Sequence, residues 1–531
     1  MSDDAPSLAP GLTPRGAREN QAPSPTLFIA AIALGAATVF GFAPFAFSGV
    51  PVVTLALLFA LWQNAPSARN AAWIGFGFGL GLLEVGASWL YIALHNFGGM
   101  PLPLAAIGTA GFCAYLALYP ALAGWLAVRW TPPRSLARVV AAAAAWTLTE
   151  WMRSLDIAGF PWLIVGYSQL TQSTSSPLAG YAPLGGVWLV TLAIVLCAAA
   201  LVMAIDAFAT PARTRGLAFI LGGVALAGVG ALLARIEWTA PVGEPVAVSL
   251  LQGNVTQELK FDPTFRDNTF RIYEEMVNAS RGRLIVLPES AYPMFAEEIP
   301  EPVVQHLLQT AKTRNGDVLA GMFTIDPPLP GQDEPRYYNT VVSLGSHPPQ
   351  FYRKRHLVPF GEIIPLEPVI GWFIRAILAI PLASQTPGAA AQPPFAILGQ
   401  KVAVDICYED AFGSDIRSQA VTATLLINVT NDAWYGHSLA AEQHNQMAAM
   451  RALETGRPLL RATNTGITSA IGHDGRELAR LPWFTRGILE LEIAGRQGAT
   501  PYLRWGDALG VLVAAVIFAA AIVVVRLGRM R

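Results

Sequence analysis

The feature that most restricts the fold of this chain is a set of eight long apolar segments. They lie near residues 26–46, 50–64, 71–95, 101–128, 136–151, 186–207, 216–234 and 507–525. A helix needs about 20 apolar residues to cross a bilayer, and a helix satisfies its own backbone hydrogen bonds there. Only 13% of the 531 residues are charged, against about 25% in soluble domains. The segments therefore predict eight transmembrane helices, of which the second and fifth are short.

Arginines occupy alternate connections between these segments. They are Arg15, Arg18, Arg69, Arg129, Arg134, Arg138, Arg213, Arg215, Arg526, Arg529 and Arg531. Positively charged loops stay on the cytoplasmic side of a membrane. With eight spans, all of these arginines fall on one side. The pattern predicts that both termini are cytoplasmic and that the segment from about 240 to 500 lies outside. We expect three parts: a bundle of seven spans at 1–242, an outer domain at 243–495, and the last span with its tail at 496–531.

The outer segment has the character of an α/β domain. From Glu244 the charge rises, and short β-like runs alternate with amphipathic helices. The predicted strands are Val246–Gln252, Leu284–Leu287, Val318–Thr324, Asn339–Leu344, Lys401–Cys407, Leu425–Val429, Pro458–Thr463, Thr468–Ile471 and Ile488–Ile493. Such alternation over about 250 residues predicts one domain with a largely buried sheet. The net charge of −1 gives no reason to expect a nucleic-acid partner.

Cys407 is a candidate nucleophile because of where it stands. The apolar run Val404–Ile406 reads as a strand that ends at Cys407, and a polar helix start follows at Gly413–Asp415. A strand-to-helix break is a common place for a nucleophile, because the strand fixes it and the turn exposes it. The other cysteines, Cys113 and Cys197, lie inside apolar segments, where a cysteine behaves as an inert small hydrophobe.

Three short motifs follow predicted strands in the outer domain. Glu289 lies in Leu287–Ser290, Lys354 lies in Tyr352–Glu362, and Cys407 begins Cys407–Glu409. Taken singly, each motif has an ordinary explanation, such as a solvated loop carboxylate or a basic surface run. Together they supply a base, a cation and a nucleophile, which is the set that acyl transfer through a thioester requires.

These motifs resemble the nitrilase superfamily and, within it, the apolipoprotein N-acyltransferase family. The resemblance rests on Gln252–Asn254, Tyr352–Glu362, Asn431–Gly436, Met450–Pro458, Gly159–Trp162, Gly166–Gln169, Ser88–Tyr91 and Thr500–Tyr502. It implies a nitrilase-like αββα sandwich inserted into an eight-helix transmembrane α bundle. It also implies a catalytic triad of Glu289, Lys354 and Cys407, with neither cofactor nor metal.

The resemblance further implies the reaction. An acyl chain passes from a phospholipid, such as phosphatidylethanolamine, to Cys407 as a thioester. The α-amino group of a diacylglyceryl-cysteine at an apolipoprotein N-terminus then takes it in ping-pong fashion. The implied location is the bacterial inner membrane, among membrane lipids, with the catalytic domain periplasmic, and we expect a monomer.

The resemblance also implies supporting roles for Glu362, Tyr408 and Glu409. Glu362 and Glu409 either orient Lys354 or hold the leaving-group proton, and Tyr408 shapes the acyl pocket. We expect Phe261 and Trp434 to contact substrate. Phe261 stands where the family often has tryptophan, so an aromatic contact is kept and the indole N–H is lost.

Several alternatives stay open on the residues alone. Val369–Ile380 is either a lid that dips into the membrane or a buried domain helix, with equal weight. A metal site at His356, His437, His444 and Asp432 is disfavoured because these residues lack tight ligand spacing. A membrane-tethered amidohydrolase would use the same triad with water as acceptor. A transporter or receptor is disfavoured by the triad and by the absence of paired half-repeats.

Overall fold

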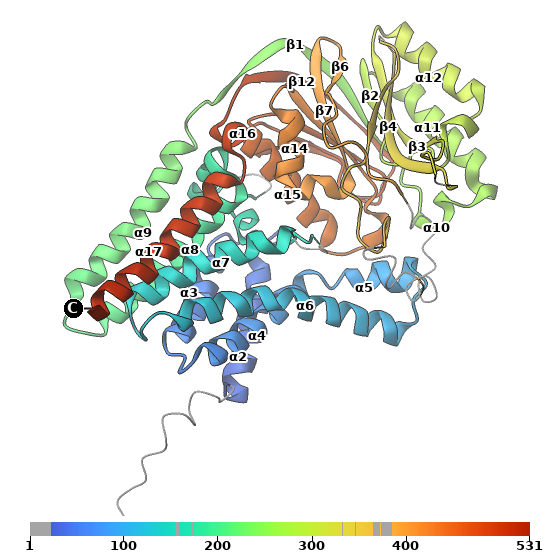
Figure 1. Cartoon of the computed structure of the whole chain (residues 1–531). Coiled ribbons are helices and arrows are strands. Elements are labelled where there is room, and N and C mark those ends of the chain that lie inside the picture. The colour runs from blue at the N-terminus through green and yellow to red at the C-terminus, as the bar shows by residue number, and fades with distance from the viewer. Residues whose placement is uncertain are drawn as a thin grey trace, which may run out of the picture.

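A computed structural model describes residues 23–155, 159–171, 175–331, 333–345, 347–364, 372 and 385–530. The described chain divides into a group of helices and a two-sheet sandwich that packs on it (Figure 1). The helices are α2 (Pro25–Thr38), α3 (Val50–Gln63), α4 (Ala68–Gly86), α5 (Leu90–Ile92), α6 (Leu102–Arg129), α7 (Leu136–Leu155), α8 (Ala182–Phe208), α9 (Arg213–Leu233) and α17 (Ala508–Met530).

All eight predicted apolar segments are helical, but not all are long and apolar enough to cross a membrane. Four meet that requirement: α6, the α8 region with its preceding turn, α9 and α17. A fifth is possible if α4 and the following Leu90–Phe97 form one span, which bends by 60°. Pro25–Gly41 and Val50–Gln63 are shorter apolar helices. The expectation of eight spanning helices is therefore not confirmed: among the described residues, four helices, or up to five, are long and apolar enough to span.

Arg138 departs from its expected place in a connecting loop. It lies in α7 and is only 4% exposed. Its guanidinium donates hydrogen bonds to the carbonyl oxygens of Trp62, Gln63 and Ala65 at 3.3–3.4 Å. Because the last carbonyls of a helix lack partners within the helix, Arg138 satisfies the end of α3 and ties it to α7. Arg15 and Arg18 lie outside the described residues.

In the part of the chain that the structure describes, the sandwich consists of two six-stranded sheets. The first has the order β12-β1-β2-β3-β4-β5, and the second has the order β11-β10-β9-β8-β7-β6. The strands are β1 (Thr239–Gln252), β2 (Leu284–Val286), β3 (Asp317–Asp326), β4 (Arg336–Gly345), β5 (Gln350–Arg353), β6 (Phe395–Ile397), β7 (Gln400–Ile406), β8 (Leu425–Thr430), β9 (Leu459–Thr463), β10 (Ser469–Ile471), β11 (Glu477–Arg480) and β12 (Gly487–Gly498).

Helices cover the outer face of each sheet, so that the domain has four layers (Figure 1). α11 (Arg266–Ala279) and α12 (Glu301–Thr313) pack on the first sheet, and α14 (Gly413–Ala420) and α15 (Ala440–Thr455) pack on the second. The strands alternate accordingly. On β2, Leu284 and Val286 face the core between the sheets, while Ile285 packs against α11 and α12. This arrangement is the expected αββα sandwich.

The last strand, β12, completes the first sheet at one edge. β12 pairs antiparallel with β1 from Thr239 opposite Gly498 to Gln252 opposite Gly487, with one irregularity between Val242 and Val246. β1 follows α9, and β12 leads through α16 (Pro501–Trp505) into α17. The chain therefore enters and leaves the sandwich on two neighbouring strands.

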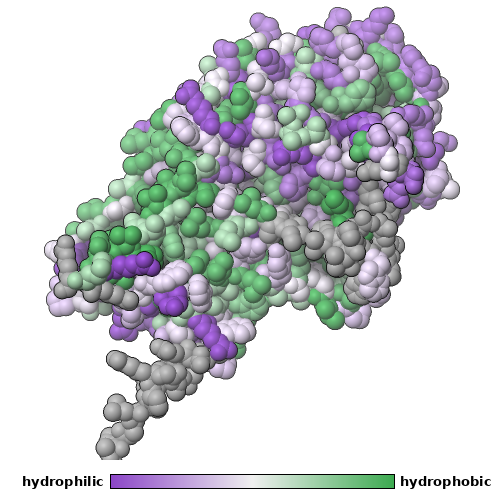
Figure 2. Space-filling view, in the orientation of Figure 1, coloured by the Kyte–Doolittle hydropathy of each residue, from purple (hydrophilic) through white to green (hydrophobic). Residues whose placement is uncertain are grey.

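Hydrophobic surface is concentrated on the helices. In Figure 2 the visible face of the helical region is mostly hydrophobic, whereas the far end of the sandwich is mostly hydrophilic. Exposed apolar side chains on these helices include Ile107, Leu118, Leu221, Val224, Leu232, Leu512 and Val516. Contiguous apolar surface of this kind needs a non-aqueous surrounding, and the protein is accordingly a membrane protein.

Candidate active site

Cys407 lies at the sharp turn after β7. It starts the helical turn η7 (Cys407–Ala411), is 5% exposed, and has a φ of +55°. A side chain other than glycine is strained in this conformation, so the surroundings must hold it. Asn428 Nδ2 donates to the Cys407 carbonyl at 3.2 Å, and His444 Nε2 lies 3.2 Å from the same oxygen.

Glu289 reaches the site from the other sheet. It follows β2 by three residues and is 6% exposed. Its Oε1 accepts a hydrogen bond of 2.7 Å from Asn339 Nδ2 on β4. Lys260, also buried, donates from Nζ to the Glu289 main-chain oxygen at 2.9 Å. The carboxylate is thus fixed both through its side chain and through its backbone.

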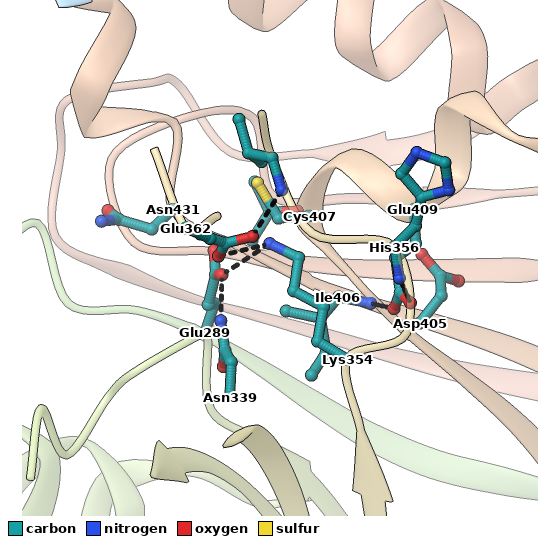
Figure 3. A network of polar contacts seen from close by, with 12 residues as sticks. Glu289, Asn339, Lys354, His356, Glu362, Asp405, Ile406, Cys407, Glu409 and Asn431 are labelled. Carbon is teal, nitrogen blue, oxygen red and sulfur yellow. Dashed lines mark hydrogen bonds and ion pairs between the residues drawn. The ribbon is translucent and has the colours of Figure 1, made fainter. Parts of the chain in front are cut away.

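Lys354 follows β5 and lies between two carboxylates. Its Nζ is 2.8 Å from Glu362 Oε1 and 3.5 Å from Glu289 Oε1. Figure 3 shows these three side chains converging beside the Cys407 sulfur. Burial disfavours the ammonium, but Glu362 and Glu289 outweigh that effect and raise the pKa of Lys354. The lysine is therefore a fixed cation rather than a base.

The Cys407 thiol is neutral in the resting site. Burial, followed by the nearby charge of Glu289, raises the pKa of the thiol well above its usual range, although Lys354 opposes this. A thiol is a poor nucleophile until it loses its proton. Glu289 is the carboxylate whose charge acts most strongly on this thiol.

Glu362 and Glu409 occupy different positions, although the sequence predicted the same alternative roles for both. Glu362 touches the Lys354 ammonium with Oε1 and accepts from Val358 N with Oε2 at 2.8 Å. Glu409 instead receives main-chain N–H bonds at 2.7–3.0 Å from Arg355, His356 and Ile406. Glu362 orients the lysine directly, whereas Glu409 joins the Lys354 loop to the Cys407 turn (Figure 3).

The remaining predicted residues line one cavity of about 510 Å³. Phe261, Tyr408 and Trp434 are in its wall together with Glu289, Lys354, Glu362 and Cys407. Tyr408 donates its hydroxyl proton to the Gly159 carbonyl oxygen at 2.7 Å. The rest of the wall comes largely from the helical region, including Trp89, Leu94, Phe97, Met100, Phe112 and Phe160. A mostly apolar cavity thus ends at the polar cluster.

The disfavoured metal ligands have other partners. His444 and Asp432 pair with each other and with Arg461 and Asp410. His356 stacks on Phe412 at 3.5 Å, and His437 stacks on Phe484 at 3.7 Å. Among the described residues, no group of three or more His, Cys, Asp or Glu side chains is arranged to hold a metal ion.

Lys260 and Asn339 are site residues that the sequence prediction missed. Burial lowers the pKa of Lys260 to about 8, against the opposing charge of Glu289. The available signal for Lys260 was its position directly before Phe261, in the segment after Gln252–Asn254. The segment Val369–Ile380 lies outside the described residues except for Trp372, which is 75% exposed.

Comparisons with known proteins agree with this architecture. A family described as apolipoprotein N-acyltransferase N-terminal domain matches residues 34–200, and the carbon-nitrogen hydrolase family matches residues 256–502. An apolipoprotein N-acyltransferase of Nitrosomonas europaea is 48% identical over 91% of this chain and 94% of its own length. One of Chromobacterium violaceum is 42% identical over 91% and 90%.

Solved structures give a more distant similarity. An amidase of the nitrilase superfamily from Nesterenkonia AN1 is 17% identical, with a TM-score of 0.35 over 50% of this chain and 95% of its own. The strong matches are those that cover the helices and the sandwich together. On that full-length similarity, the chain belongs to the apolipoprotein N-acyltransferase family.

Proposed function

We propose that this protein transfers an acyl chain from a phospholipid to the N-terminal α-amino group of diacylglyceryl-cysteine in apolipoproteins, through a thioester on Cys407. The observation that carries the proposal is the convergence of Glu289, Lys354 and Cys407 at the end of a cavity whose other wall is made by apolar helices. Family membership supports the choice of donor and acceptor.

The first half-reaction forms the thioester. Glu289 takes the thiol proton as Cys407 Sγ attacks the ester carbonyl carbon of the phospholipid. The oxyanion of the tetrahedral intermediate forms beside the Lys354 ammonium, and one such donor contributes roughly 3 kcal/mol. The C–O bond then breaks, and Glu289 returns the proton to the departing lysophospholipid oxygen. A general base of this kind contributes about 10²- to 10⁴-fold.

The second half-reaction uses the same groups in the reverse sense. The α-amino nitrogen attacks the thioester carbonyl and gives a proton to Glu289. The C–S bond breaks, the amide is formed, and the proton returns to the Cys407 thiolate. Two half-reactions on one nucleophile give ping-pong kinetics.

The supporting residues have distinct proposed roles. Glu362 holds Lys354 through the 2.8 Å ion pair, and Glu409 holds the Lys354 loop against the Cys407 turn. Tyr408, Phe261 and Trp434 contact the acyl chain from the cavity wall. We also propose that the enzyme acts as a monomer.

We also propose the finer topology. The eight predicted spans cross the bacterial inner membrane, the cavity lies at bilayer height, the sandwich at 243–495 is periplasmic, and both termini are cytoplasmic. Reaching lipid substrates within the bilayer avoids exposing acyl chains to water, which costs about 0.8 kcal/mol per CH₂. Labelling of single cysteines placed at Arg69 and Arg213, which we expect to be inaccessible from the periplasm, tests the orientation.

Mass spectrometry tests the chemistry. Purified protein incubated with phosphatidylethanolamine should gain one acyl group on the peptide that contains Cys407, while Cys113 and Cys197 serve as internal controls. Addition of a diacylglyceryl-cysteine peptide should discharge the adduct onto its amine. An adduct that only water releases would identify an amidohydrolase, and absence of any adduct would reject the thioester.

A further inference from the structure

A sealed ionic cluster lies directly behind the nucleophile. It comprises Asp410 on η7, Asp432 on η8 (Asp432–Tyr435), His444 on α15 and Arg461 on β9. None of the four is more than 2% exposed. Arg461 is 2.6 Å from Asp410 Oδ2 and 3.3 Å from Asp432 Oδ2. We call this set the buried quartet.

His444 bridges the two aspartates of the buried quartet. Its Nδ1 lies 2.9 Å from Asp432 Oδ1, and its Nε2 lies 2.8 Å from Asp410 Oδ1. Nε2 is also 3.2 Å from the Cys407 carbonyl oxygen. All three partners are acceptors, and a neutral imidazole can donate from only one nitrogen. The second oxygen of each aspartate accepts from the Arg461 guanidinium. With both aspartates as carboxylates, only an imidazolium can donate to both of them.

The surrounding charges agree with that protonation state. Burial and Arg461 disfavour the imidazolium, but Asp410 and Asp432 outweigh them and raise the pKa of His444 to about 9. Burial pushes the pKa of Asp432 upward, yet His444 and Arg461 hold it below its usual value.

Further titratable groups face the quartet, among them Tyr167, whose pKa is raised by burial and, to a smaller extent, by Asp410. Asp405 on β7 is buried, and burial together with Asp410 raises its pKa well above the usual range, which favours its neutral form. Burial likewise raises the pKa of Tyr435 well above its usual value, so the phenol stays neutral. Two anions and two cations remain, and the buried quartet has no net charge.

We propose that His444 is a positioning residue for acyl transfer: as an imidazolium it holds the carbonyl of the strained Cys407 backbone, and it cancels the second aspartate charge behind the nucleophile. Asp432 is one of the charges that disfavour the Cys407 thiolate. Without the imidazolium, the thiolate and the tetrahedral oxyanion would form next to a net negative charge. The inference rests on Cys407 being the nucleophile of the proposed function.

The test separates charge from shape with two substitutions and their combination in the full-length enzyme. His444→Gln leaves one aspartate uncompensated, whereas Asp432→Asn removes that aspartate. The double variant H444Q/D432N keeps only Asp410 and Arg461, and its cluster is neutral again. The readout is the rate at which iodoacetamide alkylates Cys407, followed on its peptide between pH 6 and 10.

The two single substitutions should change the alkylation rate of Cys407 differently. His444→Gln should slow alkylation at pH 7 by about 10- to 100-fold, as an unscreened buried charge at short range would, and shift the profile to higher pH. Asp432→Asn should alkylate at least as fast as the unmodified protein. The alkylation rate of the double variant should return to within about threefold of that of the unmodified protein. The kcat for acyl transfer should follow the same order among the variants, with little change in KM.

Other patterns would overturn the proposal. Equal slowing by both single variants, or a double variant worse than His444→Gln, would show that the cluster serves only packing. If His444→Gln does not fold, slower alkylation of Cys407 in Asp432→Asn would by itself contradict the proposal. Nitrogen NMR of labelled histidine should also show an imidazolium at pH 7.5. Alkylation needs no lipid, so failure here is distinct from absence of the acyl adduct.

Discussion

The two halves of the sandwich contribute differently to the same site. The inner half, β6–β11 with α14 and α15, carries Cys407 and the buried quartet and is joined to the membrane helices. Three hydrogen bonds join α15 to the helical region. Trp162 Nε1 donates to Gln443 Oε1 at 2.6 Å, and Gln446 Nε2 donates to the Leu170 carbonyl oxygen at 2.6 Å. Val187 N donates to Glu454 Oε1 at 2.7 Å. The outer half, β1–β5 and β12 with α11 and α12, supplies Glu289 and Lys354.

The two halves therefore differ in their contacts: the inner half is anchored to the helices, and the outer half is not the part that these hydrogen bonds anchor. The inner half fixes Cys407 relative to the helices that form the apolar cavity wall. The outer half brings Glu289 and Lys354 to Cys407 from the other sheet. Substitutions in the outer half should therefore change rate at constant stability, whereas substitutions at the junction of the inner half with the helices should change stability first.

The largest effect should come from removing one reacting group from each half. Cys407→Ala should abolish the acyl adduct and turnover, and Glu289→Gln should reduce turnover by about 10³- to 10⁴-fold because the thiol loses its base. Turnover with phosphatidylethanolamine and a diacylglyceryl-cysteine peptide measures both. In Glu289→Gln, alkylation of Cys407 should persist at high pH. Turnover retained within tenfold in this variant would remove Glu289 from the chemistry.

Loss of the cation should have the next largest effect. Lys354→Met should lower kcat by about 10²- to 10³-fold, because the oxyanion loses its charged donor. The exposed Lys401 on β7 offers a matched control, and Lys401→Met should leave kcat unchanged. Steady-state kinetics at saturating lipid separate kcat from KM. An effect confined to KM would assign Lys354 to substrate binding instead.

Stability should depend on pH through the inner half. The pKa of His444 is raised to about 9 in the folded protein, against about 6.5 in an unfolded chain. Its stabilising contribution is therefore complete below pH 6.5 and is lost as pH rises through 9, by up to about 3 kcal/mol. Melting temperatures between pH 6 and 10 should fall more steeply in the unmodified protein than in His444→Gln. Parallel curves would contradict the assignment.

The smallest effect should come from the junction between the inner half and the helices. Gly186 breaks α8 with a φ of +67°, and a Cβ there would lie 2.6 Å from Tyr502 Cε2. Gly186→Ala should destabilise by about 1–3 kcal/mol, seen as a lower melting temperature with kcat retained at low temperature. Gly222→Ala on α9 is the control, because a Cβ there meets nothing within 4 Å. Equal melting of both variants would show that the junction tolerates strain.

Much of the sandwich could be predicted from the sequence because its strands are buried on both faces. Runs such as Val318–Thr324 and Leu425–Val429 correspond to β3 and β8. The strands that the prediction missed are β5, β6 and β11, which are short and lie at or beside the edges of their sheets. An edge strand shares less of the core, so its sequence carries a weaker pattern.

The candidate site shows the same limit. Glu289, Lys354 and Cys407 were identified because each follows a strand in a distinctive motif. Lys260 and Asn339 act on Glu289 from separate segments, and only the fold brings these together. His444 was considered as a metal ligand because the sequence does not show that Arg461 and two aspartates surround it. Pairing between distant segments has no local signal.

The closure of the first sheet has a consequence for how the protein is made. β1 emerges from the ribosome directly after α9, but its neighbour β12 is translated about 240 residues later, shortly before α17. Until then the long edge of β1 lacks its partner, and such an edge is prone to pair with other chains. Synthesis of β12 must precede its pairing with β1. Interrupted translation therefore leaves an unpaired strand edge that can aggregate, rather than a smaller folded domain.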